Sequence, residues 1–308
     1  MRVLVAGATG AIGRPLVDRL VADDHEVVGT TRDEARARAL REQGAEAVVL
    51  DAFDADAVGA AVRAAEPEVV VHQLTALPQA PDPKAMAAAV VLTSRLRRET
   101  VPTFLAAAQE VGARRAIVQS ISFVTRPDGR PVHDEDAPLD DRPGFRDSTA
   151  AVRDMEAATL GTEGLEGVVL RYGFFYGPGT WYSSEGAMAA LIRKRAYPVI
   201  GRGRGRMSFV HVDDAVQATV LALDHGGPGL YNVTDDEPAM AKAWLPEVAR
   251  LLGARRPLWA PPMVARRLAG DAVVHYATTL PGNANGRARA AFGWAPRPWR
   301  QGFAEAFA

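Results

Sequence analysis

Short apolar runs alternate with segments of helical spacing along the first half of the chain. Arg2 to Ala6 forms an apolar run, and Ile12, Leu16 and Leu20 then recur at helical spacing. The same alternation predicts strands at 2–6, 25–30, 47–50, 68–74, 115–120 and 167–171, and helices at 33–42, 54–65, 85–111 and 148–160. These strands lack polar alternation, which is typical of strands buried on both faces. The pattern therefore predicts an α/β protein with a Rossmann-type, doubly wound parallel sheet.

The regular alternation ends at Gly173. Glycines, prolines and aromatic residues between 174 and 206 predict loops and short helices, and a strand at 208–212 and a helix at 213–223 follow. We therefore predict a nucleotide-binding domain over 1–173, to which 207–225 return, and a smaller substrate-binding region over 174–206 and 226–308. Residues 125–146 are rich in Pro, Asp, Gly and Arg, and they predict a surface loop that covers a site.

A glycine-rich turn joins the first strand to the first helix. It reads Gly7-Ala8-Thr9-Gly10-Ala11-Ile12-Gly13. Glycines at these places permit a positive φ, let backbone amides approach a diphosphate and allow close packing of the helix. The helix N-terminus then faces the anion. The alternative, a tight turn without a ligand, fits the repeated strand and helix units less well, so the sequence predicts a dinucleotide site.

The end of the second strand bears on which dinucleotide is bound. Thr31 and Arg32 precede Asp33 there. An arginine pairs with the 2′-phosphate of NADP, whereas a carboxylate binds the 2′-hydroxyl of NAD. We favour NADP, with Asp33 capping the next helix; the alternative has Asp33 on the ribose of NAD. Asp51, followed by Ala52 after the third strand, either accepts from the adenine amine or caps a helix.

Composition limits the class of protein further. The 308 residues carry a formal charge of -1 and no cysteine. An even charge balance gives no broad surface for nucleic acid or an anionic membrane, and no segment has the length of a membrane span or the pattern of a signal peptide. We expect a cytoplasmic protein without disulfides, and no grouping of His, Asp or Glu has the spacing of a metal site.

Three further segments complete a resemblance that covers nearly the whole chain. They are Val70-Val71-His72-Gln73-Leu74-Thr75-Ala76, Gln119-Ser120-Ile121-Ser122 and Arg171-Tyr172-Gly173-Phe174-Phe175-Tyr176-Gly177-Pro178-Gly179. With the glycine loop, they resemble the extended branch of the short-chain dehydrogenase/reductase superfamily, which contains nucleotide-sugar epimerases and dehydratases. The resemblance implies cofactor contacts for Leu74, Thr75, Ala76, Gln119, Tyr172, Gly173 and Phe174. It also implies a homodimer formed through the helices at 85–111 and 148–160.

The sequence departs from this superfamily at the catalytic pair. The family uses a tyrosine four residues before a lysine, but the first tyrosine here is Tyr172 and the only lysines are Lys84, Lys194 and Lys242. The matching places resemble Thr149 and Arg153. Arg153 can still hold the ribose or diphosphate of a cofactor, whereas a threonine cannot act as a phenol-like acid.

Other side chains are candidates for the missing roles. Ser120 or Ser122 would orient a carbonyl oxygen, unless each satisfies backbone groups at the strand end. Tyr176 or Tyr182 would supply the acid, unless both pack in the core. His72 fits a hydrogen-bonded core position, His133 with Asp134 and Glu135 fits a solvated loop, and His211 fits either a substrate contact or a structural bond.

Three classes of function agree with this sequence. The first is an NADP-dependent oxidoreductase or epimerase-like enzyme acting on a small organic substrate, such as a sugar or a secondary metabolite, through a carbonyl or hydroxyl group. The second is an isomerase or cyclase that keeps the cofactor as a structural group, and the third is a sensor that binds NADP without turnover. The glycine loop fits all three classes, so it predicts that a cofactor is bound but does not separate the classes from one another.

Overall fold

A parallel sheet of seven strands forms the centre of the protein. The computed structural model describes residues 1–78, 80 and 82–308. The strands lie in the order β12-β7-β5-β4-β1-β2-β3, and all neighbouring pairs are parallel. This arrangement confirms the predicted doubly wound fold. The strands are β1 (Arg2–Ala6), β2 (Glu26–Thr31), β3 (Glu46–Val49), β4 (Val69–His72), β5 (Arg115–Ile121), β7 (Glu166–Tyr172) and β12 (Gly229–Val233).

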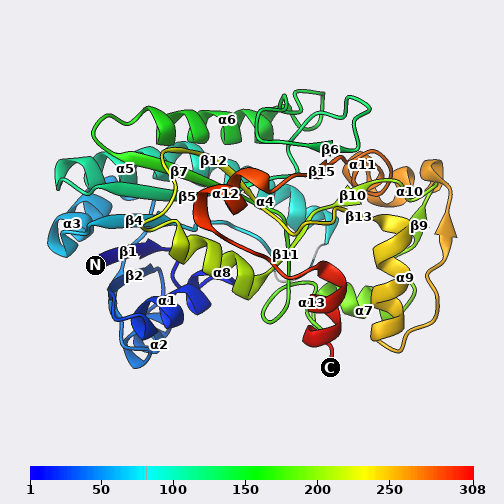
Figure 1. The fold of residues 1–308 in the computed structure, drawn as a ribbon, viewed down its shortest axis with the longest axis horizontal. Coiled ribbons are helices and arrows are strands. Elements are labelled where there is room, and N and C mark those ends of the chain that lie inside the picture. Colours follow the sequence, from blue (N-terminus) through cyan, green and yellow to red (C-terminus); the bar gives the residue numbers. More distant parts are fainter. Residues whose placement is uncertain (79, 81) are drawn as a thin grey trace.

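Helices cover both faces of the sheet (Figure 1). On one face the core contains Leu16, Leu40 and Ala215, from α1 (Gly13–Ala22), α2 (Glu34–Glu42) and α8 (Val212–Leu221), together with α12 (Gly286–Phe292). On the other it contains Phe104 and Met155, from α5 (Val101–Glu110) and α6 (Arg146–Gly161), together with α3 (Ala55–Ala65). Each central strand therefore buries alternate side chains in two separate cores.

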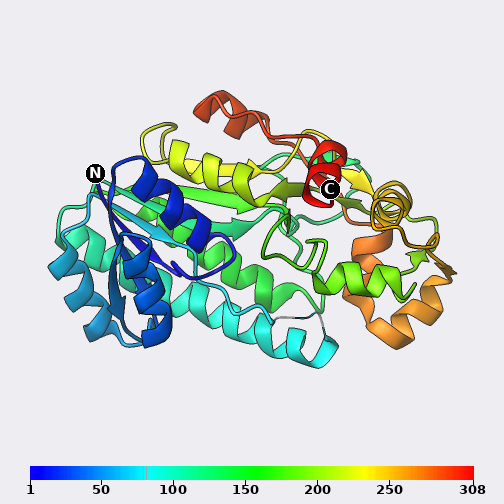
Figure 2. The same cartoon turned by 90° about the horizontal axis from the view of Figure 1, so that it is seen from below.

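The remaining elements gather at the end of the molecule opposite the N-terminus, as both views show (Figures 1 and 2). Phe209, Trp244 and Phe303 are fully buried in the core of this smaller region. Its elements are β8 (Phe174–Tyr176), α7 (Ala187–Arg193), β9 (Val199–Ile200), β10 (Arg206–Met207), β11 (Phe209–His211), β13 (Ala239–Met240), α9 (Ala241–Leu251), β14 (Trp259–Ala260), α10 (Pro262–Ala269), α11 (Asp271–Thr278) and α13 (Trp299–Ala306). Among the helices described, none is both long and apolar enough to span a membrane.

Three boundaries differ from the sequence-based predictions. The helix expected at 85–111 is divided into α4 (Pro83–Arg95), a single wide π-helical turn η1 (Leu96–Thr100) and α5. The segment at 229–233, assigned above to the substrate-binding region, is β12 and pairs with β7. The loop at 125–146 contains β6 (Val132–His133), which pairs with β15 (Gly282–Asn283). In the second and third cases a strand partner distant in sequence decides the local structure, and periodicity alone does not report it.

The start of α6 also differs from the helix predicted at 148–160. The helix begins at Arg146 after Phe145, which has no side-chain cap. The Ser148 hydroxyl donates to the Phe145 carbonyl at 2.8 Å. A serine inside the first turn satisfies a carbonyl in this way without receiving the free amides of the helix start, so Ser148 is not the cap.

Candidate cofactor and active site

The glycine loop lies between the carboxyl ends of β1 and β4, where the strand order reverses direction. Gly7 has a φ of +86°, and a β-carbon there would lie 3.0 Å from the carbonyl carbon of Gln73 at the end of β4. A β-carbon at Gly13 would lie 2.0 Å from the Gly7 carbonyl oxygen. Both positions therefore require glycine, and a reversal point of this kind is where doubly wound folds bind dinucleotides.

The amides of this loop fit a diphosphate. The Gly10 amide closes the turn on the Gly7 carbonyl at 3.0 Å. Those of Ala11 and Ile12 donate no hydrogen bond within the described residues, and α1 has neither a side-chain cap nor an acidic residue in its first turn. Free amides at the positive end of a helix attract an anion. The Oε1 atom of Gln73 beside the loop is fully buried and has no partner among the described residues, so the groups available to an anion here are the loop amides.

The end of β2 separates the two candidates for cofactor recognition. Asp33 caps α2, because its Oδ1 accepts from the Arg36 amide at 2.9 Å. Arg32 is exposed and forms no ion pair within the described part of the chain, whereas Thr31 is buried. After β3, the Asp51 carboxylate accepts from the Phe53 amide at 3.1 Å, and it is Asp54 that caps α3. The alternative that made Asp51 a helix cap was therefore wrong.

The polar ends of β5 and β7 meet on the α5 and α6 face of the sheet. Ser120 donates to Glu156 Oε1 at 2.8 Å, and Arg171 grips both oxygens of Glu156 at 2.7 and 2.6 Å. All three side chains are buried. A bidentate pair of this kind is strong where water is excluded, so this cluster fixes α6 against the strand ends. Glu156 was not predicted from the sequence. The signal that could have found it is a carboxylate one helical repeat after Thr149.

The structure also distinguishes Ser120 from Ser122. The Ser120 hydroxyl is occupied by Glu156, whereas the buried Ser122 hydroxyl has no partner within the described residues. The Ser122 backbone is held on both sides, since its amide donates to Tyr172 and its carbonyl accepts from Asn283. Both serine hydroxyls are therefore enclosed by the protein, and the role of either in orienting a carbonyl oxygen stays a prediction.

Arg153 lies at the edge of the inward face of α6. Thr149, Val152 and Glu156 are buried on this face, whereas Arg153 is exposed. Residues four apart lie close together on a helix, so Arg153 is on the same side of α6 as Thr149. The assignment of Arg153 to the nicotinamide ribose stays a prediction.

Both candidate tyrosines pack in the core of the smaller region. Tyr176 stacks on Phe303 with ring centroids 4.3 Å apart, and its hydroxyl is enclosed without a partner in the part of the chain described. Tyr182 packs edge-on against Trp244 and Phe209. Burial raises the pKa of both phenols well above the ordinary value. The hypothesis that one of them replaces the missing acid is thus not supported, because neither is placed to reach a substrate.

Other predicted positions have mixed surroundings. Tyr172 is fully buried, and its hydroxyl meets Gln73 Nε2 at 3.2 Å and Thr219 Oγ1 at 2.7 Å, so it supports the loop from below. A β-carbon at Gly173 would lie 2.2 Å from the Ser208 carbonyl oxygen. The partly accessible positions among those predicted are Gly7, Thr9, Leu74, Ala76, Gln119 and Phe174, while Thr75 is exposed and Ala52 is buried.

The histidines are structural in their contacts. His72 Nε2 meets Thr100 Oγ1 at 2.9 Å, and burial lowers the pKa of His72 to about 4. His133 is 1% exposed and bonds Thr125 and Asp128 at 2.9 Å each, so the prediction of a solvated loop histidine was wrong. The pairing of β6 with β15 draws this residue inward. His211 Nδ1 accepts from the Asp213 amide at 3.1 Å and caps α8.

Comparison with known proteins agrees with this geometry. Residues 3–234 match the NAD dependent epimerase/dehydratase family. The chain is 48% identical over 98% of its length, and 99% of the relative's, to a 3-diazoavenalumate denitrifying reductase from Streptomyces sp. It is 26% identical to the UDP-glucose 4-epimerase of Thermus thermophilus in complex with NAD, with a TM-score of 0.76 over 100% of this chain and 98% of the other. A UDP-glucose 4-epimerase from Thermotoga maritima shares the fold at 19% identity and a TM-score of 0.78, over 100% and 97% of the two chains.

Proposed function

The chain belongs to the NAD dependent epimerase/dehydratase family, and from this premise we propose that it is a reductase that replaces a diazonium group on an aromatic substrate with hydrogen. It is an NAD(P)-dependent enzyme of the oxidoreductase or epimerase type. The finer assignment rests on one observation. The inward face of α6 carries Thr149 and Val152, and the nearby phenols of Tyr176 and Tyr182 are enclosed in the core, so no proton donor of the family type faces the strand ends within the described residues.

The lack of a positioned acid favours a diazonium group over a carbonyl group as the hydride acceptor. Hydride addition to a carbonyl leaves an alkoxide that must be protonated, and a positioned acid is worth about 10²–10⁴ in rate. A diazonium group needs no such proton. A C–H bond forms at the ring carbon, the C–N bond breaks, and its electron pair leaves with N₂. One diazonium ion and one NADPH thus give the arene, N₂ and NADP⁺, with charge and atoms balanced.

The similar Streptomyces protein supports this choice. Its name describes a reductase that removes nitrogen from a diazo compound, and the similarity extends over 98% of this chain. We favour an aromatic ring because an alkyl diazonium ion loses N₂ before an enzyme can bind it. When bound, the reduced nicotinamide supplies the hydride. The loop of Gly7 to Gly13 would hold its diphosphate.

Isotope transfer tests the proposed reaction. We expect the purified protein, given NADPH deuterated at C4 and 4-carboxybenzenediazonium, to form benzoate carrying deuterium at C4. One molecule of N₂ should appear per NADPH oxidised. Mass spectrometry and gas analysis measure these products, and a reaction without enzyme gives the background of hydrolysis to the phenol. Unlabelled benzoate, whose new hydrogen comes from the solvent rather than the cofactor, or NADPH that binds without oxidation, would contradict a hydride reductase.

We propose NADP as the cofactor because Asp33 is already engaged as the cap of α2 and Arg32 is left exposed beside the predicted ribose position. Arg32→Ala is expected to weaken NADPH binding by about 10-fold to 100-fold, which is the loss of one or two charge-assisted bonds, and to leave NADH binding within about twofold. Calorimetric titration with both nucleotides measures this. Arg38→Ala is the matched control, because Arg38 is also an exposed arginine but lies on α2. Equal losses for NADPH and NADH would overturn the assignment to Arg32.

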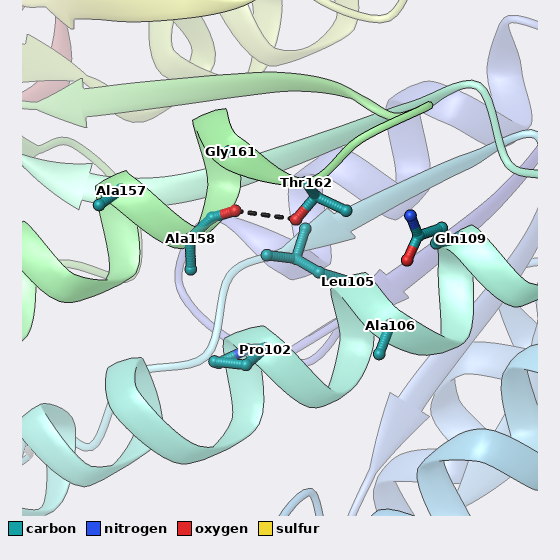
Figure 3. Close-up of a pocket in the computed structure, with 8 residues that line it drawn as sticks. All are labelled: Pro102, Leu105, Ala106, Gln109, Ala157, Ala158, Gly161 and Thr162. Carbon is teal, nitrogen blue, oxygen red and sulfur yellow. Dashed lines mark hydrogen bonds between the residues drawn. The ribbon is translucent and has the colours of Figure 1, made fainter.

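We also propose a homodimer formed through α5 and α6. A groove of about 280 Å³ runs between these helices (Figure 3). Small side chains line it, so a second pair of helices can approach closely. The lining residues are Pro102, Leu105, Ala106, Gln109, Ala157, Ala158, Gly161 and Thr162. Sedimentation equilibrium reports the mass in solution. A chain that lacks cysteine and uses NADPH suits the reducing cytoplasm, which we propose as its location.

A further inference from the structure

A buried guanidinium lies beside the carboxyl ends of β4 and β5 without a partner among the described residues. Arg97, on the wide turn η1, is 7% exposed. It forms no hydrogen bond or ion pair in the described part of the chain, whereas its neighbours Arg95 and Arg98 pair with Glu99 and Asp154. π-helical turns occur frequently at functional sites because they redirect side chains. Arg97 is the arginine of η1 that this turn directs inward.

The charge of Arg97 is not balanced by the cluster around it. The acid that acts on it is Glu156, but both oxygens of Glu156 already bind Arg171. His72 on the other side is kept neutral, since burial and the nearby Arg97 lower its pKa to about 4. Burial lowers the pKa of Arg97 only to about 10, so it remains cationic at neutral pH. One positive charge is therefore left over at this end of the sheet.

The Arg97 guanidinium belongs to a side chain that is 7% exposed and binds no counter-ion among the described residues. A buried cation without a counter-ion is costly, and such a site is completed by an anionic ligand. The planar fork of an arginine matches the two oxygens of a carboxylate.

The residues proposed to hold the cofactor's phosphates lie apart from Arg97. The free amides for the diphosphate open α1, which packs on the opposite face of the sheet from η1 and α6. The proposed 2′-phosphate site at Arg32 follows β2, and β1 separates β2 from β4 in the sheet. Arg97 instead lies with Ser120 and Glu156 on the β4 and β5 side, where the substrate half of the site is expected.

We infer that Arg97 binds a carboxylate of the substrate. The inference rests on the proposed function, and it refines the substrate to an arenediazonium that also bears a carboxylate. Such a molecule is a zwitterion: its carboxylate neutralises Arg97, while the ring carbon that bears the cationic diazonium group is left to accept hydride. Arg97 thereby selects for an acidic substrate and fixes which end of it enters first.

Binding without turnover tests this inference. The probes are cinnamate and its neutral analogue cinnamamide, titrated by calorimetry into protein saturated with NADP⁺. Wild-type protein is expected to bind cinnamate at least about 10-fold more tightly than cinnamamide, as one charge-assisted pair predicts. Arg97→Gln should bind cinnamate and cinnamamide equally well, and Arg97→Lys should retain part of the preference for cinnamate. Arg98→Gln, which changes an exposed arginine one residue away, should leave it unchanged.

Stability separates a ligand contact from a structural role. Arg97→Met removes an unbalanced buried charge, so we expect the Tm of the ligand-free protein to rise by about a few degrees. NADPH affinity should stay within about twofold of wild type in every Arg97 variant. A lower Tm for Arg97→Met would instead assign this side chain to the fold.

The outcomes are distinguishable from those of the proposed reaction. Three results would each overturn the assignment of Arg97. They are a preference for cinnamate in Arg97→Gln as large as that in wild-type protein, no preference in wild-type protein, and a preference for phenyl phosphate over cinnamate. Deuterium transfer to the arene would remain intact in those cases. Conversely, failure of deuterium transfer with an Arg97-dependent preference for cinnamate would overturn the reaction and retain the carboxylate site.

Discussion

Replacing Gly13 with alanine is expected to lower the affinity for NADPH by about 100-fold or more, which is the loss of two charge-assisted hydrogen bonds. The added β-carbon would lie 2.0 Å from the Gly7 carbonyl oxygen and 2.9 Å from Ala8 backbone atoms. Backbone cannot yield as a flexible side chain does, so the loop must move away from the start of α1. The free amides of Ala11 and Ile12 would then no longer converge on one diphosphate. Calorimetric titration with NADPH measures the effect.

Gly227→Ala is the matched control for this change. It adds the same methyl group where no heavy atom lies within 4 Å and the φ is not positive, so nucleotide binding should not change. Circular dichroism shows whether both variants remain folded. Wild-type affinity for NADPH in a folded Gly13→Ala protein would mean that this loop does not bind the diphosphate, and the cofactor assignment would then fail.

The largest effect on stability is expected from Glu156→Gln. This change removes the negative charge that faces Arg171, which is 3% exposed, and replaces one of the two oxygens that Arg171 binds with an NH2 donor. Removing one member of a buried ion pair typically costs about 3–5 kcal/mol, since the remaining charge stays desolvated. We therefore expect a loss of about that size in the free energy of unfolding, measured by urea denaturation monitored by fluorescence.

Two comparisons make this prediction specific. Glu99→Gln removes the partner of Arg95 in an exposed pair on adjoining helical turns, and its effect on stability should be small beside that of Glu156→Gln. The double variant Glu156→Met with Arg171→Met replaces both charges with apolar groups, and it should recover much of the lost stability. A loss in Glu156→Gln no larger than that in Glu99→Gln would show that the Glu156 and Arg171 pair does not hold α6 to the strand ends.

Much of the nucleotide-binding half was predictable because its signals are local. The strand at 2–6 and the helix at 54–65 agree with β1 and α3 to within one residue at either end. The glycine loop also lies where expected, since only glycine tolerates the φ of Gly7 and the space beside Gly13. Both signals depend on residues next to one another in the chain.

The active-site predictions were less successful because exposure and partners are tertiary properties. Spacing alone assigned Arg153 to the cofactor, which stays a prediction, and only the structure shows that Val152 and Glu156 form the buried face of α6. Tyr176 was a reasonable acid by composition, yet α13 brings Phe303 against its ring and encloses its hydroxyl. Arg97 was not singled out, because one arginine among several on a helix gives no sign that it is buried.

The sequence by itself determined the alternation of strand and helix, the glycine turn and the absence of the Tyr and Lys pair, because each follows from residue type and short spacing. Only the tertiary structure decided that β12 completes the sheet, that Ser122 rather than Ser120 keeps an unused hydroxyl, and that Arg97 is left with an unbalanced charge among the described residues. These depend on the desolvation and pairing of groups far apart in the chain. The free energy of a charge is set by what surrounds it in space, and its neighbours in sequence do not specify those surroundings.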